Sequence, residues 1–305
     1  MHDGKRRHRL SQKKRILIFN ADDFGRHPLV NRSVEEGVER GCLRSASIMP
    51  GEPFFDDAIQ LAKRCPKLGI GVHLTLVNGK PVLPAEEIPS LVTVHGRFYE
   101  DYKSFIKAYL TNRIHLADIY RELGAQLDKV IAAGIMPTHA DSHEHLHVMP
   151  GIFPTVLNLL ETRNIRRVRI PKVFGFRKDF LTGGPGTAFD RLGLWGLSTW
   201  NKWTVQHRGF GVPNFFAGKV GGSAVNEEFL IRLCEEIPPG VTEVMLHPGL
   251  DNAKLAKDSG WHHDYEAEHK AICSPALMER LSATGITVGN YSVIDEYCEN
   301  TRLTK

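Results

Sequence analysis

Short apolar runs of strand length alternate with amphipathic runs of helix length along nearly the whole chain. Residues 15–20 (RILIFN) form a mostly apolar run, typical of a strand that is buried on both faces. This alternation predicts an α/β fold with a largely parallel sheet. About seven strands in one run favour a (β/α)-barrel-like arrangement, with an open doubly wound sheet as the alternative. The further expected strands are 45–50, 68–74, 137–143, 166–171, 242–247 and 286–291.

The clearest helical pattern covers residues 116–133, where apolar residues recur every three or four positions and Gly134 follows. Proline and glycine punctuate the segment 78–100, which is expected to be a long loop. We found no internal repeat, so residues 15–301 are expected to form a single domain. Other helices are expected at 28–41, 53–65 and 151–163.

Charge is distributed unevenly between the first residues and the rest of the chain. Residues 1–15 contain seven of the 39 Lys and Arg and one of the 35 Asp and Glu, so the remaining 290 residues contain 32 basic and 34 acidic side chains. This nearly neutral body argues against a nucleic-acid-binding groove. We expect residues 1–14 to be a disordered basic tail, either simply solvated or weakly attracted to anionic lipid headgroups at a membrane surface.

Several protein classes are disfavoured by what the sequence lacks. No apolar stretch approaches the roughly 20 residues needed to cross a bilayer, and none near the start is typical of an export signal. The five cysteines, without CxxC spacing, fit a reducing compartment, so a cytoplasmic location is expected. No serine-hydrolase elbow, Walker A loop or dinucleotide fingerprint occurs in a suitable context. The sequence leaves open whether the protein forms a homodimer.

Polar residues with metal-binding or acid–base chemistry collect at the ends of the predicted strands. Asp22 and Asp23 follow the first strand, His73 ends the third, and His247 ends a late one. Because the carboxyl ends of parallel strands form one rim where active sites lie, these residues are predicted to share a site. Neighbouring strand residues face opposite ways, so one aspartate could bind a metal while the other accepts a proton from bound water. The alternative is that one of them caps the next helix.

The segment HADSHEHLH (139–147) places four of the 15 histidines within nine residues. In extended backbone its alternate residues share a face, whereas in a helix His143 and His147 would share one. Such a cluster predicts a metal site, and two histidines with one carboxylate leave coordination positions open for water and substrate. Imidazole ligands favour Zn, Ni, Co or Fe over Mg. The alternating candidates are His139, Asp141, His143, His145 and His147.

Five segments, in order along the chain, resemble the YdjC-like carbohydrate deacetylase family, which includes chitooligosaccharide and hopanoid-associated deacetylases. Together they extend over nearly the whole domain. The segments are FNADDFG (19–25), NRSVEEG (31–37), GVHLTLVNGKPVLP (71–84), PTHADSHEHLHVMPGIFP (137–154) and MLHPG (245–249).

This resemblance implies a barrel-like fold related to polysaccharide deacetylases and a hydrolase that removes an N-acetyl group from an amino sugar. It implies one divalent metal ion held by Asp23, His73 and His143, with Asp22 as the base and His247 as an acid or substrate contact. Family members are often described as magnesium-dependent, whereas ligand softness favours zinc, so both metals remain open. The expected supporting or substrate-contacting residues are His139, Asp141, His145 and His147.

The sequence leaves alternatives open for both the substrate and the reaction class. Residues 77–98 resemble the branch whose substrate is an N-acetylglucosaminyl lipid, whereas HADSHEHLH is closer to the chito-oligosaccharide branch. A metal phosphoesterase or a non-catalytic sugar- or metal-binding protein are the other candidate functions. Residues 172–225 could form a sugar- or lipid-facing insertion or be plain core. Their aromatic residues include Trp195, Trp200, Trp203, Phe215 and Phe216.

Overall fold

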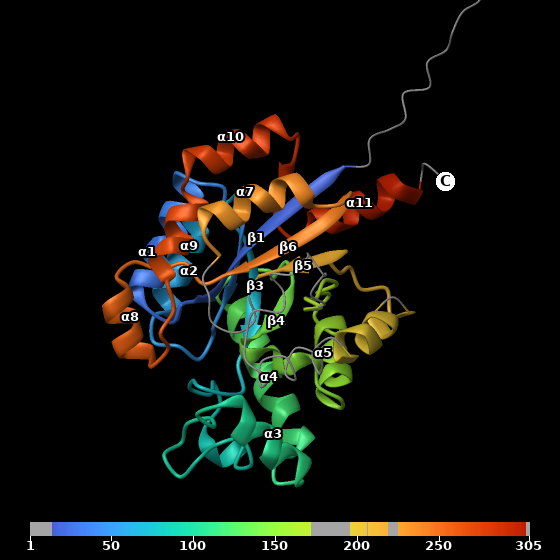
Figure 1. The fold of residues 1–305 in the computed structure, drawn as a ribbon. Helices are drawn as coiled ribbons and strands as arrows, with labels where there is room; N and C mark the ends of the chain where they lie inside the picture. The colour runs from blue at the N-terminus through green and yellow to red at the C-terminus, as the bar shows by residue number, and fades with distance from the viewer. Residues whose placement is uncertain (1–13, 172–195, 206, 219–224, 303–305) are drawn as a thin grey trace, which may run out of the picture.

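Strands and helices alternate along the chain in the computed structural model, which describes residues 14–171, 196–205, 207–218 and 225–302 (Figure 1). The strands are β1 (Arg15–Phe24), β2 (Ser45–Ile48), β3 (Gly69–Leu74), β4 (Ala140–Ser142), β5 (Phe215–Ala217), β6 (Gly240–Leu246) and β7 (Thr287–Val288). The helices before β5 are α1 (Pro28–Glu39), α2 (Phe55–Arg64), η1 (Ala85–Glu87), α3 (Tyr102–Leu110), α4 (Leu116–Ala132), η2 (His143–Val148) and α5 (Ile152–Glu161). Those after β5 are α7 (Glu227–Glu236), α8 (Asn252–Ser259), α9 (Tyr265–Ile272), α10 (Pro275–Ala283) and α11 (Val293–Arg302).

The strands pair in the order β4-β3-β2-β1-β6-β5, and every pairing is parallel. The central strand β1 is buried along its length except at Arg15, as its apolar sequence predicts. One edge of β1 pairs with β6, and the other pairs with β7 near its start and with β2 near its end. The carboxyl ends of the strands therefore meet at one rim around β1.

Isolated backbone bridges carry the sheet beyond β4 toward closure. Ala140 bridges Val168, and Arg167 bridges Gly211, which lies shortly before β5. The expected strand at 166–171 thus contributes bridges rather than a ladder, and Pro171 lacks the N–H group that would extend it. The largely parallel, barrel-like α/β fold predicted from the sequence is confirmed.

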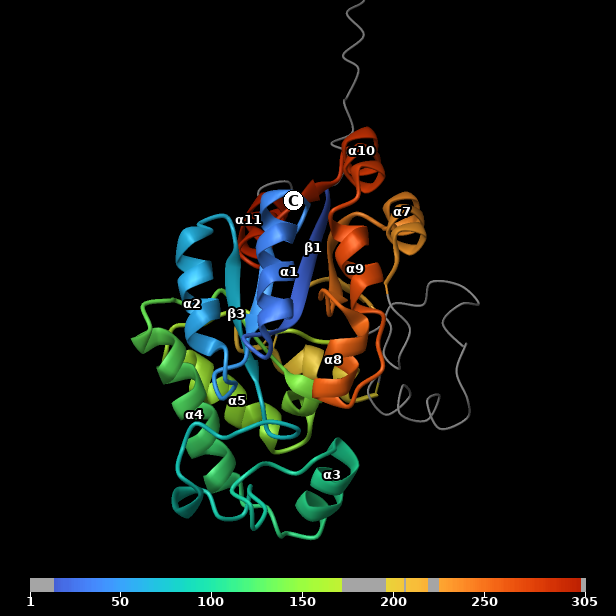
Figure 2. The same cartoon turned by 90° about the vertical axis from the view of Figure 1, so that its left-hand side faces the viewer.

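Helices cover the outer face of the sheet, and Figure 2 shows α1, α2 and α9 in front of the strands. The helix predicted at 116–133 is confirmed as α4, although Leu116 and Tyr120 lie at its exposed edge. The loop expected at 78–100 contains only the short helix η1, but α3 follows it and was not predicted. Figure 1 shows α3 at the far end of the molecule from α10.

Two sequence-based expectations fall on segments of which the structure says little. The tail 1–14 lies outside the described residues except for Lys14. Of the segment 172–225, Trp195 lies outside the described residues, Trp200 and Trp203 are exposed on a helical stretch, and Phe216 is buried. Among the described helices, none has the length and apolar character needed to cross a membrane.

Candidate active site

The end of β1 is irregular, and this irregularity separates its two aspartates. Ala21 pairs with Ala46 and Phe24 with Ile48, so the register against β2 shifts between Ala21 and Phe24. Asp23 has a positive φ of 60°, which is uncommon outside glycine. Such bulges re-aim side chains and recur next to active sites. As a result, the carboxylates of Asp22 and Asp23 contact two different groups of side chains.

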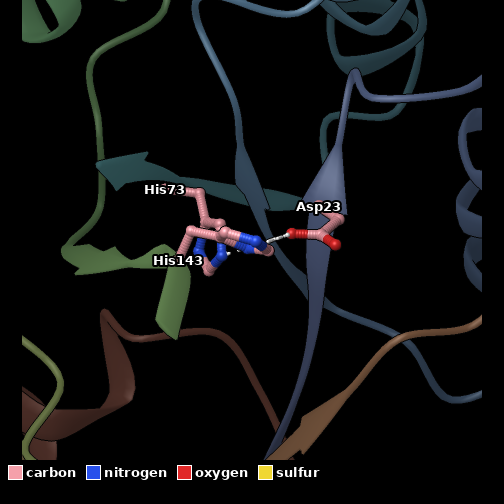
Figure 3. Close-up of side chains that lie close together, drawn as sticks. All are labelled: Asp23, His73 and His143. Carbon is pink, nitrogen blue, oxygen red and sulfur yellow. Dashed lines mark hydrogen bonds and ion pairs between the residues drawn. The ribbon is translucent and has the colours of Figure 1, made fainter. Parts of the chain in front are cut away.

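Asp23 faces His73 at the end of β3 and His143 at the start of η2 (Figure 3). The Oδ1 atom of Asp23 lies 3.4 Å from Nε2 of His73 and 3.1 Å from Nδ1 of His143. All three side chains are buried, and one ligand atom from each lies within 4.8 Å of the others. The structure therefore brings together the three residues that the resemblance implies as ligands.

The electrostatics of this cluster suit a cation. Burial raises the pKa of the Asp23 carboxyl, but the charges of His143 and Arg26 hold that pKa well below its usual value. Burial lowers the pKa of His73, yet the carboxylates of Asp141 and Asp22 raise it to about 10. Without a metal, His73 thus takes up a proton to balance the surrounding negative charge. Two imidazoles and one carboxylate are also a donor set that fits a divalent metal.

Asp141 on β4 orients the His73 ring from behind. Its Oδ1 atom lies 2.8 Å from Nδ1 of His73, and its Oδ2 atom accepts a hydrogen bond from Ser47 Oγ at 2.6 Å. This leaves Nε2 of His73 directed toward Asp23. Carboxylate–histidine pairs of this kind fix the tautomer and the direction of metal-binding imidazoles.

Asp22 is held by Arg169, a fully buried side chain that the sequence reasoning missed. The two terminal nitrogens of Arg169 donate to Oδ1 and Oδ2 of Asp22, both at 2.7 Å. The same guanidinium donates from Nε to Glu243 at 2.7 Å and pairs with Asp141 at 2.9 Å. One cation therefore aligns three carboxylates beside the Asp23 cluster. The only signal in the sequence was an arginine flanked by Val168 and Ile170 within a predicted strand.

Arg26, which the sequence reasoning also missed, faces the Asp23 cluster from the loop after β1. Its Nη1 atom lies 3.1 Å from Oδ2 of Asp23 and 3.4 Å from Nε2 of His143. The side chain is 15% exposed, so it is largely buried against the cluster but keeps some contact with solvent. A cation in this place can pair with negatively charged oxygens at the mouth of the site.

Of the two backbones considered for residues 139–147, the extended one ends at Ser142 and a short irregular 3₁₀ stretch follows it. The backbone leaves the extended conformation at His143, and Glu144 and His145 have positive φ angles of 54° and 55°. His147 contacts Ser142 Oγ at 2.6 Å and the carbonyl oxygen of Arg169 at 2.9 Å. His147 therefore supports the backbone around the site rather than joining the Asp23 cluster.

His139 and His145 also lie outside the cluster of Asp23, His73 and His143. The ring of His139 stacks on Tyr291 with centroids 3.6 Å apart, and burial lowers its pKa to about 3, so it is neutral. Its Nε2 atom lies 3.3 Å from Ser47 Oγ, the hydroxyl that donates to Asp141. His145 packs edge-on against Phe216, and its Nδ1 atom is buried without a hydrogen-bond partner.

His247 follows β6 and joins the same mouth from the other side of β1. Burial lowers the pKa of its imidazole, against the charges of Asp22 and Asp23, which raise it. The ring lies edge-on to Trp261 with centroids 5.0 Å apart. Among the described residues, no hydrogen bond links the His247 ring to the candidate residues on β1, β3 or β4.

Comparison with known families and proteins places this chain among a group of deacetylases. The profile of the family described as YdjC-like protein matches residues 16–283. A carbohydrate deacetylase from Brevibacillus brevis is 42% identical over 277 residues, which cover 90% of this chain and 98% of that protein. One from Geobacillus stearothermophilus is 32% identical, covering 91% and 97%. A chitooligosaccharide deacetylase from Yersinia enterocolitica is 27% identical, covering 92% and 99%.

A solved structure from Enterococcus faecalis V583 has the same fold. It was described as a proposed cellobiose-phosphate cleavage protein and matches with a TM-score of 0.70 and 27% sequence identity. The match covers 92% of this chain and 98% of that one. The barrel-like arrangement of the described residues is therefore shared along nearly the full length of a second protein.

Proposed function

The chain belongs to the YdjC-like protein family, and from this membership and the site geometry we propose that it is a metal-dependent carbohydrate N-deacetylase. The substrate class is an N-acetylglucosamine-type sugar, and the products are acetate and the free amine. The observation that carries the proposal is the proximity of the Asp23, His73 and His143 cluster to Asp22, which Arg169 anchors.

Asp23, His73 and His143 would hold the divalent ion, which when bound polarises the acetyl carbonyl and lowers the pKa of an attacking water. Asp22 accepts the proton of that water, because its carboxylate is fixed by Arg169 beside the cluster. A carbon–oxygen bond forms, the amide carbon–nitrogen bond breaks, and His247 gives a proton to the departing amine. General acid and base steps of this kind contribute roughly 10²–10⁴-fold each.

The metal is proposed to be zinc or magnesium, with the imidazole ligands favouring zinc. To distinguish the two metals, the ion-free protein is reconstituted with one equivalent of zinc or of magnesium, and the rates of acetate release are compared. Equal low rates with both metals would contradict this part of the proposal.

Two substrates of the proposed class compete, a chito-oligosaccharide and an N-acetylglucosaminyl glycolipid. The name of the Yersinia enterocolitica relative supports the first, and the resemblance of residues 77–98 supports the second. Acetate release from a chitobiose-type sugar and from an N-acetylglucosaminyl lipid, measured on protein of known metal content, decides between them.

The test of Asp22 as the base is Asp22→Asn, which keeps two polar atoms near Arg169 but cannot accept the proton. We expect acetate release to fall at least about 100-fold while the metal remains bound. Asp128→Asn, which changes an exposed ion pair with Arg163, is the matched control. Full activity of Asp22→Asn with metal bound would remove Asp22 as the base. A non-catalytic binding protein would instead show no acetate release in the wild type or in either variant.

The test of the ligand set is His143→Ala, which should lose the metal. An unchanged metal content would remove His143 from the ligand set. The phosphoesterase alternative predicts phosphate release from a sugar phosphate or an aryl phosphate. Arg169 is not available to grip phosphate, because all of its hydrogen bonds go to buried carboxylates.

A further inference from the structure

A second group of metal-ligand side chains lies at the same rim but shares no residue with the Asp23 cluster. His247 follows β6, His263 lies between α8 and α9, and Glu268 is on α9. One ligand atom from each lies within 4.8 Å of the other two. Figure 2 shows α8 and α9 on the opposite side of α1 from α2.

His263 is the residue whose environment calls for a ligand. Its side chain is 4% exposed, and neither ring nitrogen has a hydrogen-bond partner among the residues that the structure describes. Nε2 lies 3.0 Å from Oε1 of Glu268, but the contact lacks hydrogen-bond geometry. Buried polar atoms are nearly always satisfied, so an orphaned imidazole points to a missing water or ion.

Aromatic packing holds the His263 ring in this position. Trp261 stacks on it with centroids 4.4 Å apart and planes 20° apart, and Tyr265 packs against it at 80°. The ring therefore cannot turn away to reach solvent without losing both contacts. Packing on both sides therefore fixes the ring in a place where its nitrogens have no hydrogen-bond partner among the described residues.

Glu268 is fixed as well. It is buried, and its Oε1 atom accepts the Val225 N–H at 2.9 Å while Oε2 accepts the backbone N–H of His247. Each carboxylate oxygen keeps a second lone pair after accepting one hydrogen bond. The ring of His247 lies edge-on to that of His263, with centroids 5.6 Å apart. Among the described residues, no hydrogen bond restrains the His247 ring nitrogens.

We propose that His247, His263 and Glu268 form a second divalent-cation site that prefers zinc. Two imidazoles and one carboxylate are zinc ligands, and small rotations would bring their atoms to the usual distances of about 2.0–2.2 Å. The carboxylates of Asp22 and Asp23 act on His247, so the local field also favours a cation. A cation in this site would bind one of the two orphaned ring nitrogens of His263 and a free lone pair of Glu268 together.

This site has a consequence that rests on the proposed function. A ring nitrogen of His247 that binds a cation cannot give a proton to a departing amine. Occupation of the second site therefore inhibits the deacetylase, and zinc in excess of the first equivalent acts as an inhibitor.

The test counts zinc bound per chain after equilibration and removal of free metal. We expect two equivalents in the wild type, one in His263→Gln, one in Asp23→Asn and none in the double variant. His262→Gln, which changes the exposed neighbouring histidine, should keep two. The proposal would be overturned if the wild type bound one zinc ion per chain and His263→Gln also bound one. It would also be overturned if His263→Gln bound two. Circular dichroism checks that each variant is folded.

Cobalt gives a second readout that does not depend on activity. In the Asp23→Asn background, Co²⁺ bound by two imidazoles and a carboxylate should give visible absorption, and adding His263→Gln should abolish it. Persistence of the absorption would place the ion elsewhere. If the ion binds but no acetate is released under any condition, the proposed function fails while the second site stands.

Inhibition is tested by titrating zinc into ion-free enzyme, with each variant scaled to its own maximum. The rate of the wild type and of His262→Gln should rise through the first equivalent and fall with the second. The fall should be absent in His263→Gln, and its presence there would contradict the inhibitory role.

Discussion

The Nδ1 atom of His73 lies 2.8 Å from Oδ1 of Asp141, and this contact turns the opposite ring nitrogen toward Asp23. Asp141→Asn keeps the shape of the side chain but weakens its hold on the ring. We expect metal affinity to fall about 10–100-fold, as is typical when such a partner is lost. Isothermal titration measures it, with Asp128→Asn as the surface control. An affinity within twofold of the wild type would show that Asp141 does not orient His73.

Arg169 neutralises Asp22, Asp141 and Glu243, and all four side chains are buried. Arg169→Met leaves these buried carboxylates without a partner, so we expect the free energy of unfolding to fall by about 3–5 kcal/mol. Arg169→Lys keeps the charge but loses the two parallel hydrogen bonds to Asp22. We therefore expect a small loss of unfolding free energy and a larger relative loss in the rate of acetate release. Urea denaturation and an acetate assay separate these effects. If Arg169→Met and Arg169→Lys lost unfolding free energy equally and acetate release equally, the two parallel hydrogen bonds to Asp22 would have no specific role.

Glu243 makes stability depend on pH. Burial raises the pKa of its carboxyl from 4.5 to about 7, against the lowering effect of Arg169. Because the folded pKa is raised, the stabilisation is fully present below pH 4.5 and is lost as the pH rises through about 7. Glu243→Gln mimics the protonated form and does not ionise. Its unfolding free energy relative to that of the wild type should therefore rise between pH 4.5 and about 7, by at most about 3 kcal/mol. Parallel pH curves for the two proteins would contradict this.

Gly71 lies against the ring of His139, and a Cβ atom added there would lie 2.3 Å from the Cε1 atom of His139. Gly71→Ala must therefore push the ring off Tyr291 or move β3, at a cost of about 1–3 kcal/mol in unfolding free energy. Gly196→Ala is the control, because nothing lies within 4 Å of its added Cβ. Chemical denaturation measures both. Equal stability of the two variants would show that the close contact is easily relieved.

Metal binding at the Asp23 cluster should release a proton. The pKa of His73, which burial lowers but Asp141 and Asp22 raise to about 10, keeps its ring protonated at pH 8 in the ion-free protein. A ligand imidazole must be neutral, so binding displaces about one proton per ion. Titration of the His263→Gln variant in buffers of different ionisation enthalpy counts that proton. A binding enthalpy that does not vary with the buffer would contradict the prediction.

The alternation of strands and helices, the largely parallel sheet and the placement of chemistry at the carboxyl ends of strands followed from sequence patterns. Buried strands such as β1 and β3 are apolar on both faces, which distinguishes them from surface elements. The helix α3 was missed because only Phe105 and Ala108 of it are buried, which leaves little periodicity to detect.

The strand-end pattern placed Asp22, Asp23, His73 and His143 at the rim, but only the family resemblance, and not the pattern, indicated that Asp23, His73 and His143 would meet. The bulge near Asp23 and the left-handed residues Glu144 and His145 redirect the chain locally, and neither follows from alternation. Arg169 was missed because the carboxylates that it binds lie 147 and 74 positions away in the chain. An arginine flanked by apolar residues in a predicted strand indicates a buried partner without identifying it.

The register shift between Ala21 and Phe24 lies in a strand that is hydrogen-bonded to neighbours on both edges. Lengthening or shortening β1 there by a single residue would swap the surroundings of the two aspartates and disable both. Laboratory evolution toward new sugars should therefore accumulate changes in the segments that follow the strands and leave positions 21–24 untouched.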